Sequence, residues 1–217
     1  STTDNLVDSP TNYGHDYGNG GEVVGNYATW NPLIPNGTGV TCTFSNGNLT
    51  VSNGSASGGN AASSFVVSSG KWYYEGQAYG TSGSSHLIGI FNSTNTISGV
   101  QNFGTIRYGN AGWYDLSANN TVSNTWTGDG ATIGVAWDCD AGKCWFSING
   151  VYVNSGNPAA GTGAAFTFTP GTAVRPFLAF DNIAGTKVWH TNFGQRPWAY
   201  SPPVGFSALN TKNLPRP

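Results

Sequence analysis

Hydrophobic and polar residues alternate along residues 131–153, whose sequence is ATIGVAWDCDAGKCWFSINGVYV. Ile133, Val135 and Trp137 would lie on one side of an extended chain, with small or polar residues on the other. This is the pattern of a half-buried β-strand. After a short polar loop the alternation resumes, with Phe146 and Ile148 on one side. The stretch therefore predicts a strand and its antiparallel neighbour.

Residues 149–150 are Asn-Gly, the pair that most readily takes positive φ at both central positions of a type I′ turn. Such a turn predicts a third strand that returns antiparallel through Tyr152. A ribbon of two or three strands is only marginally stable in water. We therefore expect a second sheet to cover the apolar face of this meander.

The rest of the chain supplies further short strands that are separated by turn-forming residues. We expect them at residues 40–44, 48–51, 64–67, 71–79, 86–91, 105–108, 113–116, 174–181 and 187–193. In residues 71–79, the face that begins with Trp72 runs from large to small side chains, which is expected where two sheets meet. Pro176 lacks an amide hydrogen, so it predicts that residues 174–181 form an edge strand or contain a bulge.

This spacing of strands, with no helical period between them, predicts an all-β fold with two antiparallel sheets packed as a sandwich. The composition agrees, because 32 Gly and 11 Pro among 217 residues favour turns over helices. We expect one sandwich domain at residues 40–198 and an extended N-terminal arm at residues 1–39. Residues 199–217 should form a Pro-rich tail that is extended and contains no strand. The aromatic residues of both arms would order them, either against the sandwich or against a neighbouring subunit.

The formal net charge is −2, from 8 basic and 10 acidic side chains. So few charges form no basic stripe that could follow a phosphate backbone, so we expect no nucleic-acid partner. No apolar run approaches the roughly 18 residues that would span a bilayer, so we expect no membrane insertion. The chain contains no Met and begins at Ser1, so we expect a processed product or a portion of a longer polypeptide.

Cys139 and Cys144 flank the polar loop of the meander, whereas Cys42 stands alone. The pair could lie on neighbouring strands at a distance that allows a disulfide. Two reduced, half-buried thiols are the alternative, and the odd third cysteine fits that alternative better. Two cysteines without further ligands nearby are a poor zinc site, so we expect no metal.

Catalytic chemistry finds little support in the sequence. A glycosidase needs two facing carboxylates, yet the only glutamates are Glu22 and Glu75. Asp138 and Asp140 flank a turn, where we expect them to be solvated and to stabilise the turn. The three histidines lie in separate segments without a serine or cysteine motif, and we expect His190 to be structural. The chain is therefore not expected to be an enzyme or to bind a cofactor.

Aromatic residues border a Gly-rich turn in the hairpin expected at residues 105–116. Tyr108, Trp113 and Tyr114 form our candidate recognition surface, because a rigid ring beside a turn can stack on a sugar or anchor a protein contact. The alternative is that these rings only cover the end of the sandwich. No catalytic, cofactor-binding or metal-binding residue is assigned.

A series of motifs resembles, in order and spacing, those of the SPRY domain family. They are GKWYYEG (70–76), LIGIF (87–91), RYGNAGWY (107–114), GDGATIGVAWD (128–138), WFSINGV (145–151), VRPFLAF (174–180) and VWHTNFGQRPW (188–198). The resemblance covers roughly residues 40–198. It implies a lectin-like, jelly-roll sandwich that does not catalyse a reaction and that binds through loops at one edge. The loops of this chain are rich in Gly, Ser and Asn and match no known ligand motif, so the ligand stays open.

The flanking segments DSPTNYG and RPWAYSPPVGFSALNTKNLP resemble the arms of SPRY-like domains in virion structural proteins of tailed phages. This resemblance implies a capsid decoration, fibre or tail component on the virion or outside the cell. Its partners would be other virion proteins, within a larger oligomeric assembly, or a glycan on the host surface. A secreted, lectin-like carbohydrate-binding module is the alternative.

Overall fold

The computed structural model of the chain describes residues 26–34, 42–53, 58–80, 86–94, 104–107, 113–114, 119–120, 129–180 and 185–215. For residues 104–107, 113–114 and 119–120 it describes the strands without their side chains. No helix in these ranges is long and apolar enough to cross a membrane.

The described residues form fifteen strands and one short 3-10 turn, η1. Their bounds are β1 Thr43–Ser45, β2 Thr50–Asn53, β3 Gly59–Ala62, β4 Lys71–Tyr79, β5 His86–Asn92, β6 Gly104–Arg107, β7 Trp113–Tyr114, β8 Asn119–Asn120, β9 Thr132–Asp138, β10 Lys143–Ile148, β11 Val151–Tyr152, η1 Val153–Ser155, β12 Phe166–Thr167, β13 Val174–Phe180, β14 Lys187–Asn192 and β15 Ser207–Ala208.

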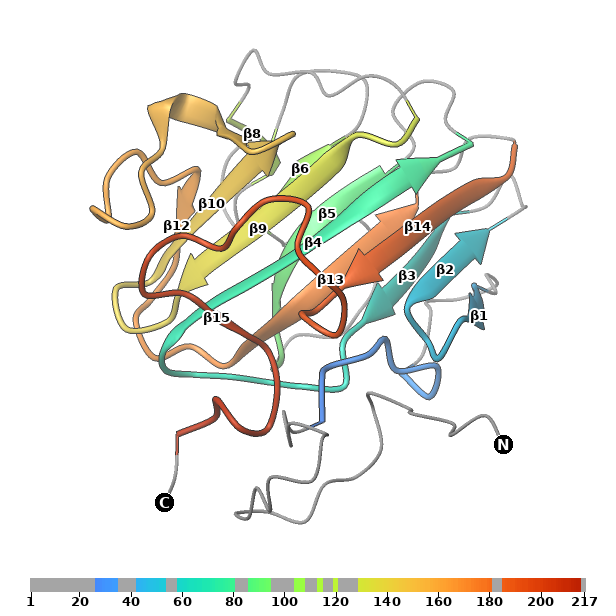
Figure 1. Cartoon of the computed structure of the whole chain (residues 1–217), viewed down its shortest axis with the longest axis horizontal. Coiled ribbons are helices and arrows are strands. Elements are labelled where there is room, and N and C mark those ends of the chain that lie inside the picture. Colours follow the sequence, from blue (N-terminus) through green and yellow to red (C-terminus); the bar gives the residue numbers. More distant parts are fainter. Residues whose placement is uncertain are drawn as a thin grey trace.

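Two sheets pack face to face, as predicted (Figure 1). The larger, nine-stranded sheet has the order β1-β2-β14-β4-β9-β10-β11, with β12 added to β10 and β15 added to β4. The smaller, six-stranded sheet has the order β3-β13-β5-β6-β7-β8. All pairings between these strands are antiparallel except that of β15 with β4. The predicted antiparallel sandwich is therefore confirmed.

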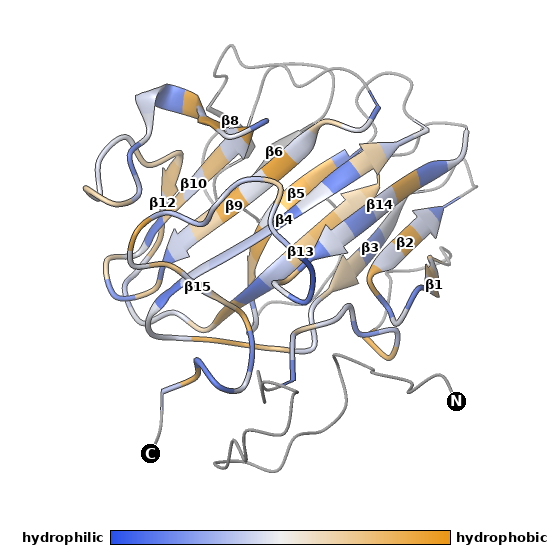
Figure 2. Cartoon of the chain, in the orientation of Figure 1, coloured by the Kyte–Doolittle hydropathy of each residue, from blue (hydrophilic) through white to orange (hydrophobic). Residues whose placement is uncertain are grey.

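The core lies between the sheets and is built by the alternation seen in the sequence. Ile133, Val135 and Trp137 of β9 are fully buried, and Phe146 of β10 packs into the same cluster. Figure 2 shows hydrophobic bands separated by paler ones along β9. The Asn149-Gly150 turn also has the predicted geometry, with φ of 48° and 80°.

Part of the outer face of the nine-stranded sheet is buried as well, which the half-buried pattern did not predict. Tyr73, Ala136 and Trp145 form a second apolar cluster there with Phe206. The C-terminal segment crosses this face (Figure 1) and brings Trp198 onto the same cluster. The tail therefore acts as a partial third layer over the larger sheet.

Pro176 lies inside an interior strand, so the prediction of an edge or bulge position was wrong. β13 pairs with β5 along its whole length, with Pro176 opposite Ile90, but pairs with β3 only from Phe177 onward. The carbonyl of Pro176 accepts a hydrogen bond of 3.0 Å from the amide of Ser63, on the β3 side. The amide and carbonyl of a strand residue point to the same side. The missing proline hydrogen therefore faces the side where the β3 ladder has ended, and no ladder bond is lost.

Residues 26–30 and 207–211 run side by side along one margin of the sandwich. Tyr27 bridges to Asn210, and the amide of Ala28 donates a hydrogen bond of 2.9 Å to the carbonyl of Leu209. Trp30 has no exposed surface, and its indole N–H donates a hydrogen bond of 2.6 Å to the hydroxyl of Thr191 in β14. The tail is mostly irregular, as expected, but it does contain the short strand β15.

Candidate functional site

A row of polar side chains crosses the outer face of the nine-stranded sheet. Thr132 of β9 lies opposite Gln77 of β4, Gln77 lies opposite His190 of β14, and His190 lies opposite Thr50 of β2. The Gln77 side-chain amide donates a hydrogen bond of 3.1 Å to the Thr132 hydroxyl. The Nδ1 atom of His190 lies 2.9 Å from the Thr50 hydroxyl oxygen. The strand register therefore aligns amide, hydroxyl and imidazole groups on one surface.

Glu75 holds the C-terminal segment against this face. It lies two residues before Gln77 in β4, on the same side of the sheet. Its Oε1 atom accepts hydrogen bonds from the amide of Ala199 at 2.7 Å and from the side chain of Asn192 at 3.3 Å. Its Oε2 atom accepts from the amide of Tyr200 and the hydroxyl of Tyr73, both at 3.3 Å. Only 3% of Glu75 is exposed. Four donors thus compensate the burial of this carboxylate.

Asn192, at the end of β14, shapes the turn that leads into the segment. Its side-chain oxygen accepts hydrogen bonds from the amides of Gly194 at 2.9 Å and Arg196 at 3.2 Å. Its side-chain nitrogen donates to the carbonyls of Arg196 at 3.2 Å and Pro197 at 3.1 Å. The backbone around Arg196 is therefore fixed from two directions.

Trp198 anchors the same segment through apolar packing. Its ring meets that of Tyr73 edge to face, with centroids 5.2 Å apart. Such aromatic pairs stabilise a fold by about 0.5–1.5 kcal/mol beyond the area that they bury. Packing and hydrogen bonding together therefore hold residues 196–200 against the sheet.

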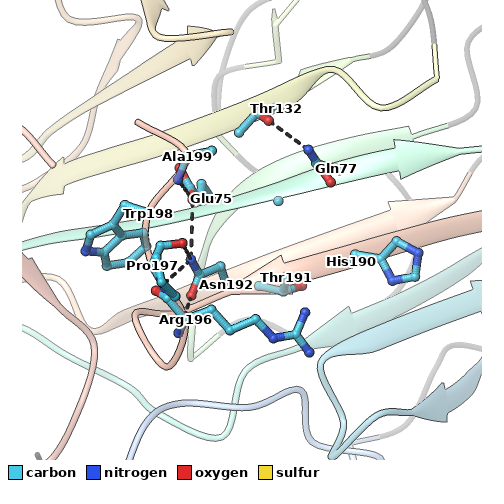
Figure 3. A pocket seen from close by; sticks show the side chains of 11 residues that line it. Glu75, Gln77, Thr132, His190, Thr191, Asn192, Arg196, Pro197, Trp198 and Ala199 are labelled. Atoms are coloured by element: carbon cyan, nitrogen blue, oxygen red, sulfur yellow. Dashed lines mark hydrogen bonds between the residues drawn. The ribbon is translucent and has the colours of Figure 1, made fainter. Parts of the chain in front are cut away.

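The polar row and residues 196–199 enclose a hollow of about 220 Å³, which we call the outer pocket. Its floor is formed by Gln77, Thr132 and His190, and its wall by the fastened segment. Figure 3 shows the side chain of Arg196 extending along the pocket toward His190. The guanidinium of Arg196 makes no ion pair with any residue that the structure describes.

Burial of the ring lowers the pKa of His190, and the charge of Arg196 lowers it further. His190 is therefore neutral at neutral pH, and its ring can both donate and accept hydrogen bonds. The pocket thus offers neutral hydrogen-bonding groups and one cation. This combination suits the binding of a polar group.

Known proteins match this chain in structure but not in sequence. No model of a known protein family and no curated protein matches the chain. Among solved structures, the SPRY domain of human HERC1 matches with a TM-score of 0.55 at 16% identity, over 75% of this chain and 96% of that chain. The TRIM65 PSpry domain matches with a TM-score of 0.51 at 12% identity, over 75% of this chain and 88% of that chain.

This chain has a SPRY-like fold. The structural likeness confirms the fold class and the resemblance that the sequence motifs indicated. At these identities it establishes the fold alone. Sites and partners of the SPRY-like domain must therefore be argued from its own residues.

The candidate recognition surface stays a prediction. Tyr108 lies outside the described residues, and Trp113 and Tyr114 form β7, whose side chains are not described. The backbone of β7 pairs with β6 and β8 at the edge of the smaller sheet, as the predicted hairpin requires. The outer pocket lies on the other sheet, so the structure provides a second candidate surface.

The outer pocket was not predicted from the sequence. Its polar residues alternate with core residues on β4 and β14. This alternation predicts that they face outward, but it does not predict that they line a pocket. The wall comes from residues 196–199, and its contact with Glu75 spans 124 positions of the chain. The one signal available was the NFGQ motif at residues 192–195, whose asparagine proves to organise the turn.

Asp138 stabilises the turn after β9, as predicted, whereas Asp140 bonds to the turn that precedes β4. Asp138 accepts a hydrogen bond of 2.9 Å from the amide of Ala141, and Asp140 accepts one of 3.1 Å from the amide of Gly70. The predicted solvation of Asp138 was wrong, however, because only 4% of this residue is exposed. The ammonium of Lys71 lies 3.2 Å from its second oxygen and offsets part of the cost of burial.

The three cysteines are free and buried. Cys144 lies opposite Trp137 in the ladder of β9 and β10, whereas Cys139 lies beyond the end of β9. The pair is therefore reduced, which is the second of the two alternatives, and is fully buried. Burial raises the pKa of Cys42 to about 11 and that of Cys139 to about 12, so neither thiol is a nucleophile at neutral pH.

Within the ranges that the structure describes, no group of three or more His, Cys, Asp or Glu residues could hold a metal ion.

Proposed function

We propose that this SPRY-like domain is a non-enzymatic binding module of a phage virion, as a capsid decoration, fibre or tail component. It would contact other virion proteins or attach the particle to the host surface. The observation that carries the binding role is the architecture itself. A rigid two-sheet sandwich holds a hairpin with aromatic residues at one edge and a preformed polar pocket on one face.

The use of the buried carboxylates supports a role without catalysis. Glu75 is occupied by four hydrogen-bond donors, and Asp138 by the Ala141 amide and the Lys71 ammonium. A glycosidase needs two carboxyl groups that face each other across a substrate, roughly 5–10 Å apart. Neither of these two buried groups is available for that task, because each completes the fold.

The virion role is supported by the flanking sequences. The segments DSPTNYG and RPWAYSPPVGFSALNTKNLP resemble the arms of SPRY-like domains in virion proteins of tailed phages. The second segment packs on the nine-stranded sheet through Trp198, Phe206 and β15. It therefore forms part of the domain that would be mounted on the particle.

Binding by the hairpin is tested by the variant Trp113→Ala in the full chain. Fluorescently labelled protein would be measured on host cells by flow cytometry and on purified virus particles by co-sedimentation. We expect the variant to lose most of the binding at an unchanged melting temperature. A melting temperature lowered by several degrees would instead place the ring in the core, and full binding would exclude Trp113 from the surface.

A secreted carbohydrate-binding module is the second candidate, and the polar outer pocket favours it. The two functions differ in what the isolated chain does. A secreted module would bind immobilised glycans as a monomer, as measured on a glycan array with protein of verified monomeric mass. A virion component that depends on multivalent display would bind the same array only after it is assembled into oligomers.

A further inference from the structure

The outer pocket contains a cation whose charge no described residue neutralises. Arg196 is exposed at the rim, and its backbone is fixed on both sides by Asn192. Because the backbone is already ordered, only the side chain of Arg196 loses conformational entropy when the guanidinium binds a ligand. Its planar donors match a carboxylate, with two parallel N–H···O bonds. The rim is therefore built to receive an anionic group.

The floor of the pocket consists of neutral hydrogen-bonding groups. The side chains of Gln77, Thr132 and His190 provide an amide, a hydroxyl and a neutral imidazole. Internal hydrogen bonds use one amide hydrogen of Gln77 and the Nδ1 atom of His190. The second amide hydrogen, the hydroxyl hydrogen of Thr132 and the Nε2 atom of His190 are left for a ligand. Adjacent hydroxyl groups on a sugar ring can pair with such groups. A protein anchor would instead favour an apolar floor, because the residues that dominate protein interfaces are large and desolvated.

The charge balance of the pocket limits the charge of the ligand. Arg196 carries one positive charge at the rim, while Glu75 carries one negative charge beneath the wall. A dianion such as phosphate would have no second cation here and would face a buried carboxylate. A single carboxylate at the rim, away from Glu75, needs one guanidinium only.

The size of the pocket limits the ligand in the same way. Its 220 Å³ is smaller than the roughly 300–1,000 Å³ typical of pockets that enclose a drug-sized molecule. One ring with its substituents is therefore the unit that the pocket can hold, with the rest of a chain extending into solvent.

We propose that the outer pocket binds one acidic sugar residue, with its carboxylate on Arg196 and its hydroxyl groups on Gln77, Thr132 and His190. The proposal rests on the attachment role given above, since it specifies the glycan class of the host surface. It assigns recognition to the face of the larger sheet, in addition to the hairpin of the smaller sheet.

The experiment uses isotope-labelled full chain and NMR titration with methyl glycosides of glucuronic acid, galacturonic acid and N-acetylneuraminic acid. Methyl glucoside and methyl galactoside are the neutral counterparts. We expect at least one acidic glycoside to shift the amide signals of Gln77, Thr132 and His190. It should bind at least tenfold more tightly than its neutral counterpart. The inference is overturned if no acidic glycoside shifts these signals, or if neutral and acidic sugars bind equally.

Two variants separate the role of Arg196 from general charge. Arg196→Gln should weaken binding of the acidic glycoside at least tenfold and leave binding of the neutral one unchanged. Lys212→Gln removes the same charge from another exposed site and should change neither affinity. Equal effects of the two variants would show a nonspecific field and contradict the assignment. Unchanged melting temperatures would confirm that both variants are folded.

Two further ligands test the assignment to a sugar. N-acetyl-aspartate amide presents a carboxylate on a peptide unit, and inorganic phosphate presents a dianion. If either binds at the same residues as tightly as the acidic glycosides, the sugar assignment is wrong. The proposed virion role can fail separately. Absence of the chain from particles leaves the pocket intact, and a pocket without sugar affinity leaves the virion role intact.

Discussion

The carboxylate of Glu75 in β4 accepts a hydrogen bond of 2.7 Å from the backbone amide of Ala199, which lies 124 residues later in the chain. This contact joins the middle of the nine-stranded sheet to the C-terminal segment. It also sets the position of the wall of the outer pocket, because Ala199 follows Arg196 by three residues. The tail is thus coupled to the proposed binding surface.

Replacing the carboxylate should loosen the tail. Glu75→Gln replaces one carboxylate oxygen by an NH₂ group. Both oxygens accept hydrogen bonds from backbone amides, and an NH₂ group cannot accept such a bond. We expect a loss of about 1–3 kcal/mol in the free energy of unfolding. Amide hydrogen exchange at Ala199 and Tyr200 should become faster. Asp140→Asn is the control, because this exposed side chain accepts a single hydrogen bond, from Gly70. An equal change in both variants would contradict the role given to Glu75.

Trp30 should be part of the fold and not part of a detachable arm. The ring is fully buried against Tyr74 and Phe193, and its N–H is bonded to Thr191. Trp30→Ala should lower the free energy of unfolding by about 3–5 kcal/mol, as measured by chemical denaturation. Leu33→Ala, at a side chain that is 88% exposed in the same segment, should change it by less than about 0.5 kcal/mol. A small effect of the Trp30 variant would show that residues 26–34 are dispensable for the core.

Acid should destabilise the domain through His86. Burial of the ring between the sheets lowers its pKa to about 4, against the opposing effect of its hydrogen bond to the Val188 carbonyl. The unfolded chain therefore takes up the proton at higher pH than the folded chain. The full stability is present above about pH 6.5 and decreases as the pH falls toward 4. The gap between the two pKa values corresponds to about 3 kcal/mol.

The variant His86→Gln isolates this effect. The pH dependence of the free energy of unfolding between pH 6.5 and 4 should be flatter in the variant than in the wild-type protein. His190→Gln serves as the comparison, because the pKa of His190 is lowered at a more exposed position. If the two profiles of wild type and His86→Gln coincide, His86 is not buried as a neutral ring.

The number of free thiols should distinguish a reduced from an oxidised pair. All three cysteines are free and buried, so a thiol reagent at neutral pH should label none of them in the folded protein within minutes. In denaturant without reducing agent it should label three per chain. A count of one in denaturant would show that Cys139 and Cys144 form a disulfide.

Local pattern was sufficient to predict most of the strands. The face of β9 that carries Ile133, Val135 and Trp137, and the turn at Asn149, follow from alternation and turn chemistry alone. Each of these depends on neighbours within a few residues. The order of strands within each sheet did not follow from such patterns, and the interior position of Pro176 was missed for this reason.

The outer pocket depends on relationships between distant residues. Gln77 and His190 become neighbours only through the register of β4 and β14. The burial of Glu75 and Asp138 depends on donors from the tail and from Lys71. Composition and periodicity contain no information about such pairings, so the pocket could not be predicted from the sequence.

We propose that this SPRY-like domain is carried on virus particles as a binding component. The most direct measurement is quantitative mass spectrometry of particles purified by density gradient from a culture that carries the gene. The account predicts that this chain sediments with the major capsid protein at a constant ratio across the particle peak. Recovery of the chain only in the soluble fraction, as a monomer, would contradict it.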